Sequence, residues 1–230
     1  MTIAPPTWAA TDFHTVDLSV DDVPAVFALY AESLAAVPDP AAVRADAPSF
    51  FEKIFAVGGE IIGLFDGLVM IGYGVIRPEL EEEHDRVGLD RVVPADAPMR
   101  VLDGSAVRPA YWRHGLQRTT IDARIARAAE LGATHVIAKA SPGNVPSMRN
   151  LTKQGFHILG RVMKPYGWRY VHHRPVHLTA AEPIEGEWYP AHDVDGAEAM
   201  FREGRAAFAA KRDDAGEPML KFTLGPDAPR

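Results

Sequence analysis

A short basic turn followed by a helix is the part of this sequence whose residue types best suit chemistry. Residues 105–117 predict the end of a strand, then a turn with one glycine, Gly115, and then the start of a helix. Such a turn directs backbone N–H groups and the positive end of the helix dipole towards an anion. Four basic side chains surround it: Arg108, Arg113, His114 and Arg118. The sequence therefore predicts a site for a phosphate-bearing ligand.

A carboxylate, Asp103, lies shortly before this turn. If Met99–Val107 is a strand, alternation places its odd-numbered residues on one face: Val101, Asp103, Ser105 and Val107. Asp103 is then the best-placed carboxylate to act as a general base, directly or through a water molecule. The alternative is that Asp103 and Gly104 mark a β-bulge or turn with no part in proton transfer.

The charge of the whole chain favours a small ligand over a polymer. The 230 residues carry 24 Lys and Arg against 31 Asp and Glu, a formal net charge of −7. Because no global basic field attracts phosphates, we expect no binding to nucleic acid or to an anionic membrane. The absence of cysteine excludes disulfides and a cysteine nucleophile. With no signal peptide visible and no apolar run of membrane-spanning length, we expect a cytoplasmic protein.

Two other clusters of polar residues have plainer interpretations. The acidic stretch before the central strand could attract a cationic amine, or it could be a solvated loop; its members are Glu79, Glu81, Glu82, Glu83 and Asp85. Three histidines crowd the last strand before residue 178, namely His172, His173 and His177. Neighbouring residues of a strand point to opposite faces, so we expect no metal site from these histidines.

The elements that position these residues follow from hydrophobic spacing and from chain breakers. Strands are predicted at 13–18, 60–65, 68–76, 99–107, 133–140, 156–163 and 168–177. Helices are predicted at 23–34, around 50–55, at 115–131 and at 144–154. Residues 77–98 are expected to be a long loop or a short extra helix. This order predicts a mixed α/β sheet with helices on both faces.

Composition changes after Leu178, so we expect two parts, a main domain at 1–178 and a C-terminal extension at 179–230. In the extension, residues 180–188 resemble a connector, and Phe201 and Phe208 suit a docking helix from about Asp193 to Arg212. Alternating residues predict a closing strand: Leu220, Phe222 and Leu224. A segment of roughly fifty residues does not easily make an independent core. We therefore expect it to pack on the main domain or on a second subunit.

The chain resembles the GNAT acetyltransferase superfamily in four features that occur in the family's order. Two apolar strands joined at Asp66 and Gly67 come first, and Ala106–Arg118 is similar to the family's acetyl-CoA pyrophosphate loop. A helix and a strand ending near Lys139 follow, and Asn144–Phe156 is similar to the family's Asn-x-x-(Ser/Ala)…Gly-Phe helix. The close resemblance covers residues 99–176.

The resemblance implies a fold and a cofactor. The fold is GNAT-like, with a mixed, mostly antiparallel central sheet, helices on both faces and here a C-terminal helix–strand extension. The co-substrate is acetyl-CoA, with its pyrophosphate on the turn and its pantetheine arm paired with a strand where two strands splay apart. The implied contacts are Ser105, Ala106 and Val107 for the arm, Arg113, His114, Gly115, Leu116, Gln117 and Arg118 for the pyrophosphate, and Asn144 and Ser147 for the pantetheine or nucleotide.

Two parts of the family pattern differ here. In the loop, Trp112 stands where Arg or Gln is usual and Gln117 where Gly or Ala is usual, although backbone N–H groups can act with any residue but proline. The family often has a tyrosine acid four residues before its Gly-Phe pair, where this chain has Leu151. Tyr166, in the last hairpin turn, is the substitute acid that we predict, and Tyr111 is a second possibility.

The activity implied by the resemblance is acetyl-CoA-dependent N-acyl transfer to an amine. The acceptor is expected to be a small or amino-acid-like molecule that attacks directly in a ternary complex, with a backbone N–H near Val107 stabilising the oxyanion. Two alternatives stay open: a non-catalytic acyl-CoA-binding module, and an acetyltransferase that acts on a protein partner. The extension also leaves room for a homodimer.

Overall fold

Strands from all parts of the described chain form one sheet of ten strands. The computed structural model describes residues 13–40, 43–178 and 185–224. Their strands are β1 (Phe13–Leu18), β2 (Glu60–Asp66), β3 (Val69–Pro78), β4 (Met99–Val107), β5 (His135–Ala140), β6 (His157–Lys164), β7 (Gly167–Pro175), β8 (Gly186–Pro190), β9 (Ala207–Arg212) and β10 (Pro218–Thr223). The helices are α1 (Val23–Ala36), α2 (Pro48–Ala56), α3 (Leu116–Glu130), α4 (Val145–Lys153) and α5 (Val194–Arg202).

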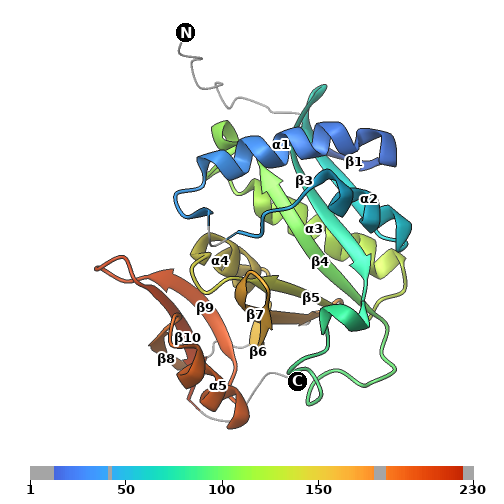
Figure 1. Cartoon of the computed structure of the whole chain (residues 1–230). Coiled ribbons are helices and arrows are strands. Elements are labelled where there is room, and N and C mark those ends of the chain that lie inside the picture. The colour runs from blue at the N-terminus through green and yellow to red at the C-terminus, as the bar shows by residue number, and fades with distance from the viewer. Residues whose placement is uncertain (1–12, 41–42, 179–184, 225–230) are drawn as a thin grey trace.

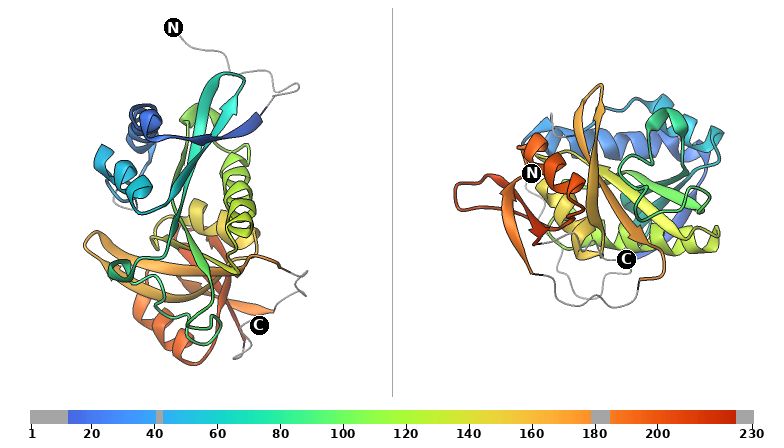
Figure 2. Two further views of the ribbon diagram at one scale, coloured as in Figure 1. Left: turned by 90° about the vertical axis from the view of Figure 1, so that its right-hand side faces the viewer. Right: turned by 90° about the horizontal axis from the view of Figure 1, so that it is seen from below.

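The sheet has the order β1-β2-β3-β4-β5-β7-β6-β9-β10-β8 (Figure 1). Neighbouring strands are antiparallel except for β4 and β5, which pair in parallel. Helices α1 and α2 lie on one side of β2 and β3, and α3 lies on the other side (Figure 2). The predicted mixed, mostly antiparallel sheet with helices on both faces is therefore confirmed.

Strands β4 and β5 separate halfway along β4. Their parallel pairing covers only Met99–Leu102 against His135–Ala138, after which β4 continues beside β3 and β5 beside β7. Between β3 and β4, Ile76 of β3 pairs with Leu102, and Gly74 of β3 pairs with Ser105. One β3 residue, Val75, thus lies opposite the two residues Asp103 and Gly104, which is a β-bulge. The bulge bends β4 away from β5 and opens a gap between them.

A buried arginine supports this bulge from the α3 side. Arg124 is 2% exposed, and its Nη1 donates to the carbonyl oxygens of Val75 and Asp103, each at 3.2 Å. A Cβ at Gly74 would come within 2.6 Å of the Arg124 Nε, so only glycine leaves room for this side chain. Burial lowers the pKa of Arg124 to about 10, which still leaves its guanidinium charged at neutral pH.

The C-terminal part differs from the sequence prediction in two places. The single helix expected from Asp193 to Arg212 is wrong, because α5 ends at Arg202 and Gly204 follows with a positive φ of 86°. Phe208 therefore lies in strand β9, where pairing with β10 outweighs the helix propensity of the alanine-rich run. The expected connector also differs, because its last residues, 186–188, belong to strand β8. Residues 180–184 of that expected connector lie outside the described residues.

A shared core joins this part to the strands before it. Leu220 and Phe222 of β10 and Phe201 of α5 are buried together with residues of α4, β6 and β7. The Tyr170 hydroxyl on β7 donates to the Ala191 carbonyl oxygen at 2.8 Å. Within the described ranges, no helix has the length and apolarity needed to cross a membrane.

Replacing Phe222 by alanine is expected to destabilise the whole chain rather than its C-terminal strands alone. Phe222 is 1% exposed in the shared core, so Phe222→Ala should lower the free energy of unfolding by about 3–5 kcal/mol. Urea denaturation should show one shifted transition, and the half-buried Phe208→Ala should cost clearly less. A separate early transition with an unchanged main one would contradict the shared core.

Candidate active site

The turn before α3 has the geometry of an anion cradle. Arg113 and Gly115 both adopt left-handed backbone conformations, with φ of 69° and 79°. Gly115 is the N-cap of α3 and has no side chain to accept from the first-turn N–H groups. Among these groups, the Arg118 N–H donates to the Gly115 carbonyl oxygen at 2.8 Å. An oxyanion placed at the turn would satisfy the N–H groups before it, which have no acceptor inside the helix. A non-glycine residue held at positive φ, as Arg113 is, is typical of such functional turns.

The basic residues around the turn divide into two groups. Arg113, His114 and Arg118 are exposed around the helix N-terminus, where an anion would bind. Arg108 instead lies towards α1, where it pairs with Glu32 and donates through Nε to the Met70 carbonyl oxygen at 2.8 Å. The expectation that Arg108 surrounds the anion site is therefore wrong, because an acidic partner on α1 holds it elsewhere.

Beyond the bulge, backbone groups of β4 point into the gap between β4 and β5. The Arg108 N–H donates to the Ile71 carbonyl oxygen at 2.8 Å, and Val107 lies opposite Gly72. By antiparallel alternation, Ser105 and Val107 then direct their N–H and C=O groups away from β3, while Ala106 directs its own towards β3. Since β5 no longer pairs here, the N–H groups of Ser105 and Val107 suit an extended ligand that lies along β4.

Two aromatic residues hold the turn against the end of β4. The Trp112 Nε1 donates to the Val107 carbonyl oxygen at 2.6 Å, and the Ser33 hydroxyl donates to the same oxygen at 3.1 Å. The Tyr111 hydroxyl donates to Asp66 at 3.1 Å, beside the β2–β3 hairpin. Trp112 thus supports the loop at the position where it departs from the family pattern. Tyr111 is likewise engaged in holding the loop.

Residues of α4 complete the side of the gap next to α3. The Asn144 Oδ1 accepts from the Ser147 N–H at 3.2 Å and caps α4. The Gln117 Oε1 accepts from the Asn150 Nδ2 at 2.6 Å and links α3 to α4. Ser147 and Gln117 line a small cavity together with Asp103, Ser105 and Lys139. Leu116 is buried below the turn.

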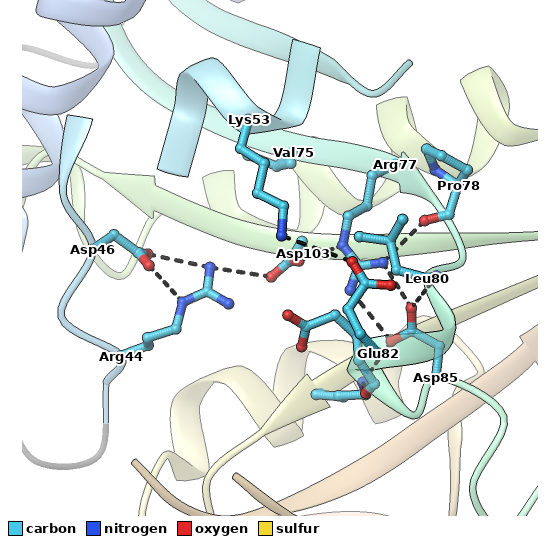
Figure 3. A network of polar contacts seen from close by, with 12 residues as sticks. Arg44, Asp46, Lys53, Val75, Arg77, Pro78, Leu80, Glu82, Asp85 and Asp103 are labelled. Carbon is cyan, nitrogen blue, oxygen red and sulfur yellow. Dashed lines mark hydrogen bonds and ion pairs between the residues drawn. The ribbon is translucent and has the colours of Figure 1, made fainter. Parts of the chain in front are cut away.

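Asp103 lies at the centre of a chain of alternating charges (Figure 3). Its Oδ2 accepts from the Arg77 Nε at 2.7 Å, and its Oδ1 lies 3.4 Å from the Arg44 Nη2. Arg44 also binds Asp46 at 2.5 Å, and Arg77 binds the buried Asp85 at 2.7 Å. The β-bulge expected as the alternative for Asp103 is present, and Asp103 also lines the small cavity in the gap between β4 and β5. A part of Asp103 in proton transfer stays a prediction.

The neighbouring charges keep Asp103 ionised. Burial alone would raise the pKa of Asp103, but Arg44 and Arg77 outweigh burial and lower that pKa below its ordinary value. The pKa of Asp85 is also lowered, since Arg77 and Lys139 outweigh its burial. The pKa of Asp46 is raised instead, because burial there exceeds the effect of Arg44.

Tyr166 reaches the same region from the β6–β7 turn. The guanidinium of Arg44 lies 5.8 Å from the centre of the Tyr166 ring, and that of Arg169 lies 4.6 Å from it. Arg44 therefore stands between the two predicted catalytic residues, Asp103 and Tyr166. Sequence reasoning missed Arg44, Arg77 and Arg169, because they come from three separate segments without a local motif.

The acidic stretch is partly an anchor. Asp85 is buried and binds Lys139 at 2.5 Å, and the Glu83 carboxylate binds Lys164 at 2.6 Å. The Glu83 carbonyl oxygen accepts from both lysines at 2.7 Å. These contacts hold the loop against β5 and β6, while the other acidic residues, Glu79, Glu81 and Glu82, are exposed. The solvated-loop interpretation thus fails for Asp85 and Glu83.

Comparisons with known proteins agree with this geometry. The family model described as acetyltransferase (GNAT) domain matches residues 16–157. Similar solved structures include a ribosomal-protein-S18-alanine N-acetyltransferase from Escherichia coli, at 15% identity and a TM-score of 0.52 over 75% of this chain and 99% of that one. A phosphinothricin acetyltransferase from Sinorhizobium meliloti in complex with acetyl-CoA has 16% identity and a TM-score of 0.53 over 75% and 94%.

A third similar structure is yncA, a putative acetyltransferase from Salmonella typhimurium with its cofactor acetyl-CoA. It has 15% identity and a TM-score of 0.52 over 74% of this chain and 96% of that one. At these identities the structures establish the shared fold. A comparison with curated proteins found no significant sequence match.

Asp85→Asn is expected to destabilise the fold in a pH-dependent way. The substitution breaks a buried ion pair, so it should cost about 3–5 kcal/mol of unfolding free energy at pH 7. Because the folded pKa of Asp85 is lowered, its contribution is complete above the unfolded value of about 4 and is lost as the pH falls further. Urea denaturation at pH 7 and at pH 3 should show the difference between variant and wild type shrinking.

Glu79→Gln is the matched control, since Glu79 pairs with Arg86 near the surface and should contribute less than about 1 kcal/mol. Equal costs for Asp85→Asn and Glu79→Gln would contradict the structural role of Asp85.

Proposed function

This chain belongs to the GNAT acetyltransferase family, and on that premise we propose that it transfers an acetyl group from acetyl-CoA to an amine. The observation that carries the proposal is the gap between β4 and β5. It joins an anion cradle at Gly115 to strand N–H groups of Ser105 and Val107 that point away from β3, where β5 no longer pairs. These features suit the two parts of acetyl-CoA in order, a pyrophosphate and then an extended arm that ends in a thioester.

In this proposal the backbone does most of the cofactor binding. The pyrophosphate accepts from N–H groups of the turn between Arg113 and Arg118, near its exposed basic side chains. The pantetheine amides pair with Ser105 and Val107 as a short extra strand. On the α4 side, the Asn144 amide nitrogen and the Ser147 hydroxyl donate to the arm or the nucleotide.

The transfer itself is a direct attack. The neutral amine nitrogen forms a bond to the thioester carbonyl carbon, and the oxyanion that develops accepts from a backbone N–H near Val107. The carbon–sulfur bond then breaks, so that the amine nitrogen loses a proton and the CoA sulfur gains one. We propose Tyr166 as the donor of that proton to the sulfur, because its turn lies beside the Arg44 that also holds Asp103.

The role proposed for Asp103 follows from its pairing. A carboxylate whose pKa is held low by two arginines is a weak proton acceptor, but it is ionised at every pH where an amine reacts. Asp103 is therefore proposed to attract and orient the acceptor amine, and proton removal proceeds through water. In this proposal Asp103 belongs to the catalytic site at the bulge, and the solvent takes up the proton that the amine loses.

Gly115→Val should weaken CoA binding strongly. Valine is strained at φ 79°, so the turn must change shape, and we expect at least a tenfold loss of CoA affinity in calorimetry. Gly132→Val is the matched control, because Gly132 follows the same helix at φ 74° and an added Cβ there would have open space around it. It should cost similar stability and leave CoA affinity unchanged.

Unchanged CoA affinity in Gly115→Val would refute the assigned cradle. Release of free CoA thiol with a panel of amines, together with the mass of the acetylated product, tests transfer itself. CoA binding without any acetylated product would favour the non-catalytic binding module.

The pH profile of turnover should report the amine and not Asp103. Because Asp103 has a lowered pKa, we expect kcat/KM to rise with pH as the acceptor ammonium loses its proton, with no separate ionisation between pH 5 and 9 that Asp103→Asn removes. Asp103→Asn should lower kcat/KM at least tenfold across this range and leave CoA affinity intact. An ionisation near neutral pH that disappears in Asp103→Asn would instead identify Asp103 as the general base.

A further inference from the structure

A buried positive charge without a matching carboxylate lies beside the acceptor side of the site. Arg169 on β7 is 6% exposed, and its Nη1 donates to the Trp168 carbonyl oxygen at 2.8 Å. Its Nη2 is buried and has no hydrogen-bond partner among the described residues. Buried donors in folded proteins are almost always satisfied. This group is therefore open to an acceptor that the protein itself does not supply.

The carboxylates of this charge network are already paired with other cations. The pairs are Asp46 with Arg44, Asp103 with Arg44 and Arg77, Asp85 with Arg77 and Lys139, and Glu83 with Lys164. No ion pair of Arg169 with a carboxylate occurs in the part of the chain that the structure describes. Arg124, also buried without a carboxylate partner in that part of the chain, instead donates to backbone carbonyl oxygens. Arg169 is thus a buried cation whose charge no carboxylate of the network offsets, and whose Nη2 no carbonyl oxygen satisfies.

Two guanidinium groups converge on one aromatic ring. Arg169 lies 4.6 Å and Arg44 lies 5.8 Å from the centre of the Tyr166 ring, and Arg44 also lies 4.1 Å from that of Phe50. The pKa of Arg169 is lowered, because burial and the like charge of Arg44 together outweigh the opposite effect of Tyr166. Two like charges this close repel each other. An anion bound beside them would offset this repulsion.

We propose, building on the acetyl transfer inferred above, that the acceptor is a small amine that also carries an oxyanion such as a carboxylate, which Arg169 binds with Arg44 beside it. Tyr166, in the two-residue turn between β6 and β7, covers the guanidinium. A shift of its ring that keeps the hydroxyl in the site opens Nη2 to the acidic group. The amine of the same molecule then faces Asp103, on the other side of Arg44.

Charge complementarity favours such a zwitterion over a simple amine. An acceptor with only an ammonium group would bring another positive charge next to Arg44 and Arg169 and would leave Nη2 of Arg169 unsatisfied. An acceptor with both groups places its negative end at the surplus cation and its positive end at Asp103. Arg169 is thus assigned as a residue that determines acceptor specificity.

The test uses matched acceptors that differ only in the acidic group. Free amino acids and the corresponding amino acid amides are compared with acetyl-CoA as donor, and kcat/KM is measured for each pair. For the wild type we expect at least a tenfold preference for the acid. Arg169→Gln should remove this preference by slowing the acids alone, and Arg169→Lys should retain part of it, because lysine keeps the charge and loses the fork of donors.

Arg161→Gln is the matched control. Arg161 lies on the neighbouring strand β6 and contacts the Trp168 ring at 4.1 Å, but it is paired with Asp195 and Glu198. This variant should keep the preference of the wild type. Unchanged CoA affinity in each variant verifies that the fold and the cofactor site are intact.

Equal kcat/KM for acids and amides in the wild type would overturn this inference and leave acetyl transfer standing. A preference for acidic peptides over free amino acids would also overturn it. If no amine is acetylated, acetyl transfer fails and binding decides the inference. Thermal stabilisation of the CoA-saturated protein by an amino acid, present in the wild type and lost in Arg169→Gln, supports it, and absence of any stabilisation refutes it.

Discussion

The parting of β4 from β5 after Leu102 is the constraint on which the rest of this structure depends. A strand that loses its neighbour exposes backbone N–H and C=O groups that need other partners. Arg124 satisfies the carbonyl oxygens of the bulge, and Ser33 and Trp112 satisfy that of Val107. The protein thus supplies donors for the carbonyl oxygens and leaves strand N–H groups facing the gap. A ligand with carbonyl groups along an extended arm complements this pattern.

Ion pairs on the opposite face of the bulge keep the side chain of Asp103 charged. Asp103 sits where the bulge turns its side chain towards the gap, and an isolated buried carboxylate there would take up a proton. Arg77 prevents this by binding Asp103 and Asp85 together, and Asp85 in turn fixes the loop that precedes β4. The same ion pairs therefore keep a charge at the site and hold the loop that covers β5 and β6.

The sequence predicts features that depend on local pattern and misses those that depend on long-range contacts. The strand, turn and helix from Met99 to Glu130 are confirmed because glycine, alternation and helical spacing act over a few residues. Arg44, Arg77 and Arg169 could not be found this way, since only the folded sheet brings them together. The Asp193–Arg212 prediction failed for the same reason, because pairing with β10 decides the conformation of an alanine-rich run.

The C-terminal strands also bear on the gap, through α4. Val145 and Met148 of α4 are buried in the core that α5 and β10 share, and the Arg212 Nη2 on β9 contacts the Gly143 carbonyl oxygen at 3.4 Å. These contacts fix both ends of the short segment that contains Asn144 and Ser147. Since a nine-residue helix has little stability of its own, its position depends on what packs against it. The extension of the sheet beyond β6 is therefore a physical support for the α4 side of the gap, at a distance from the turn before α3.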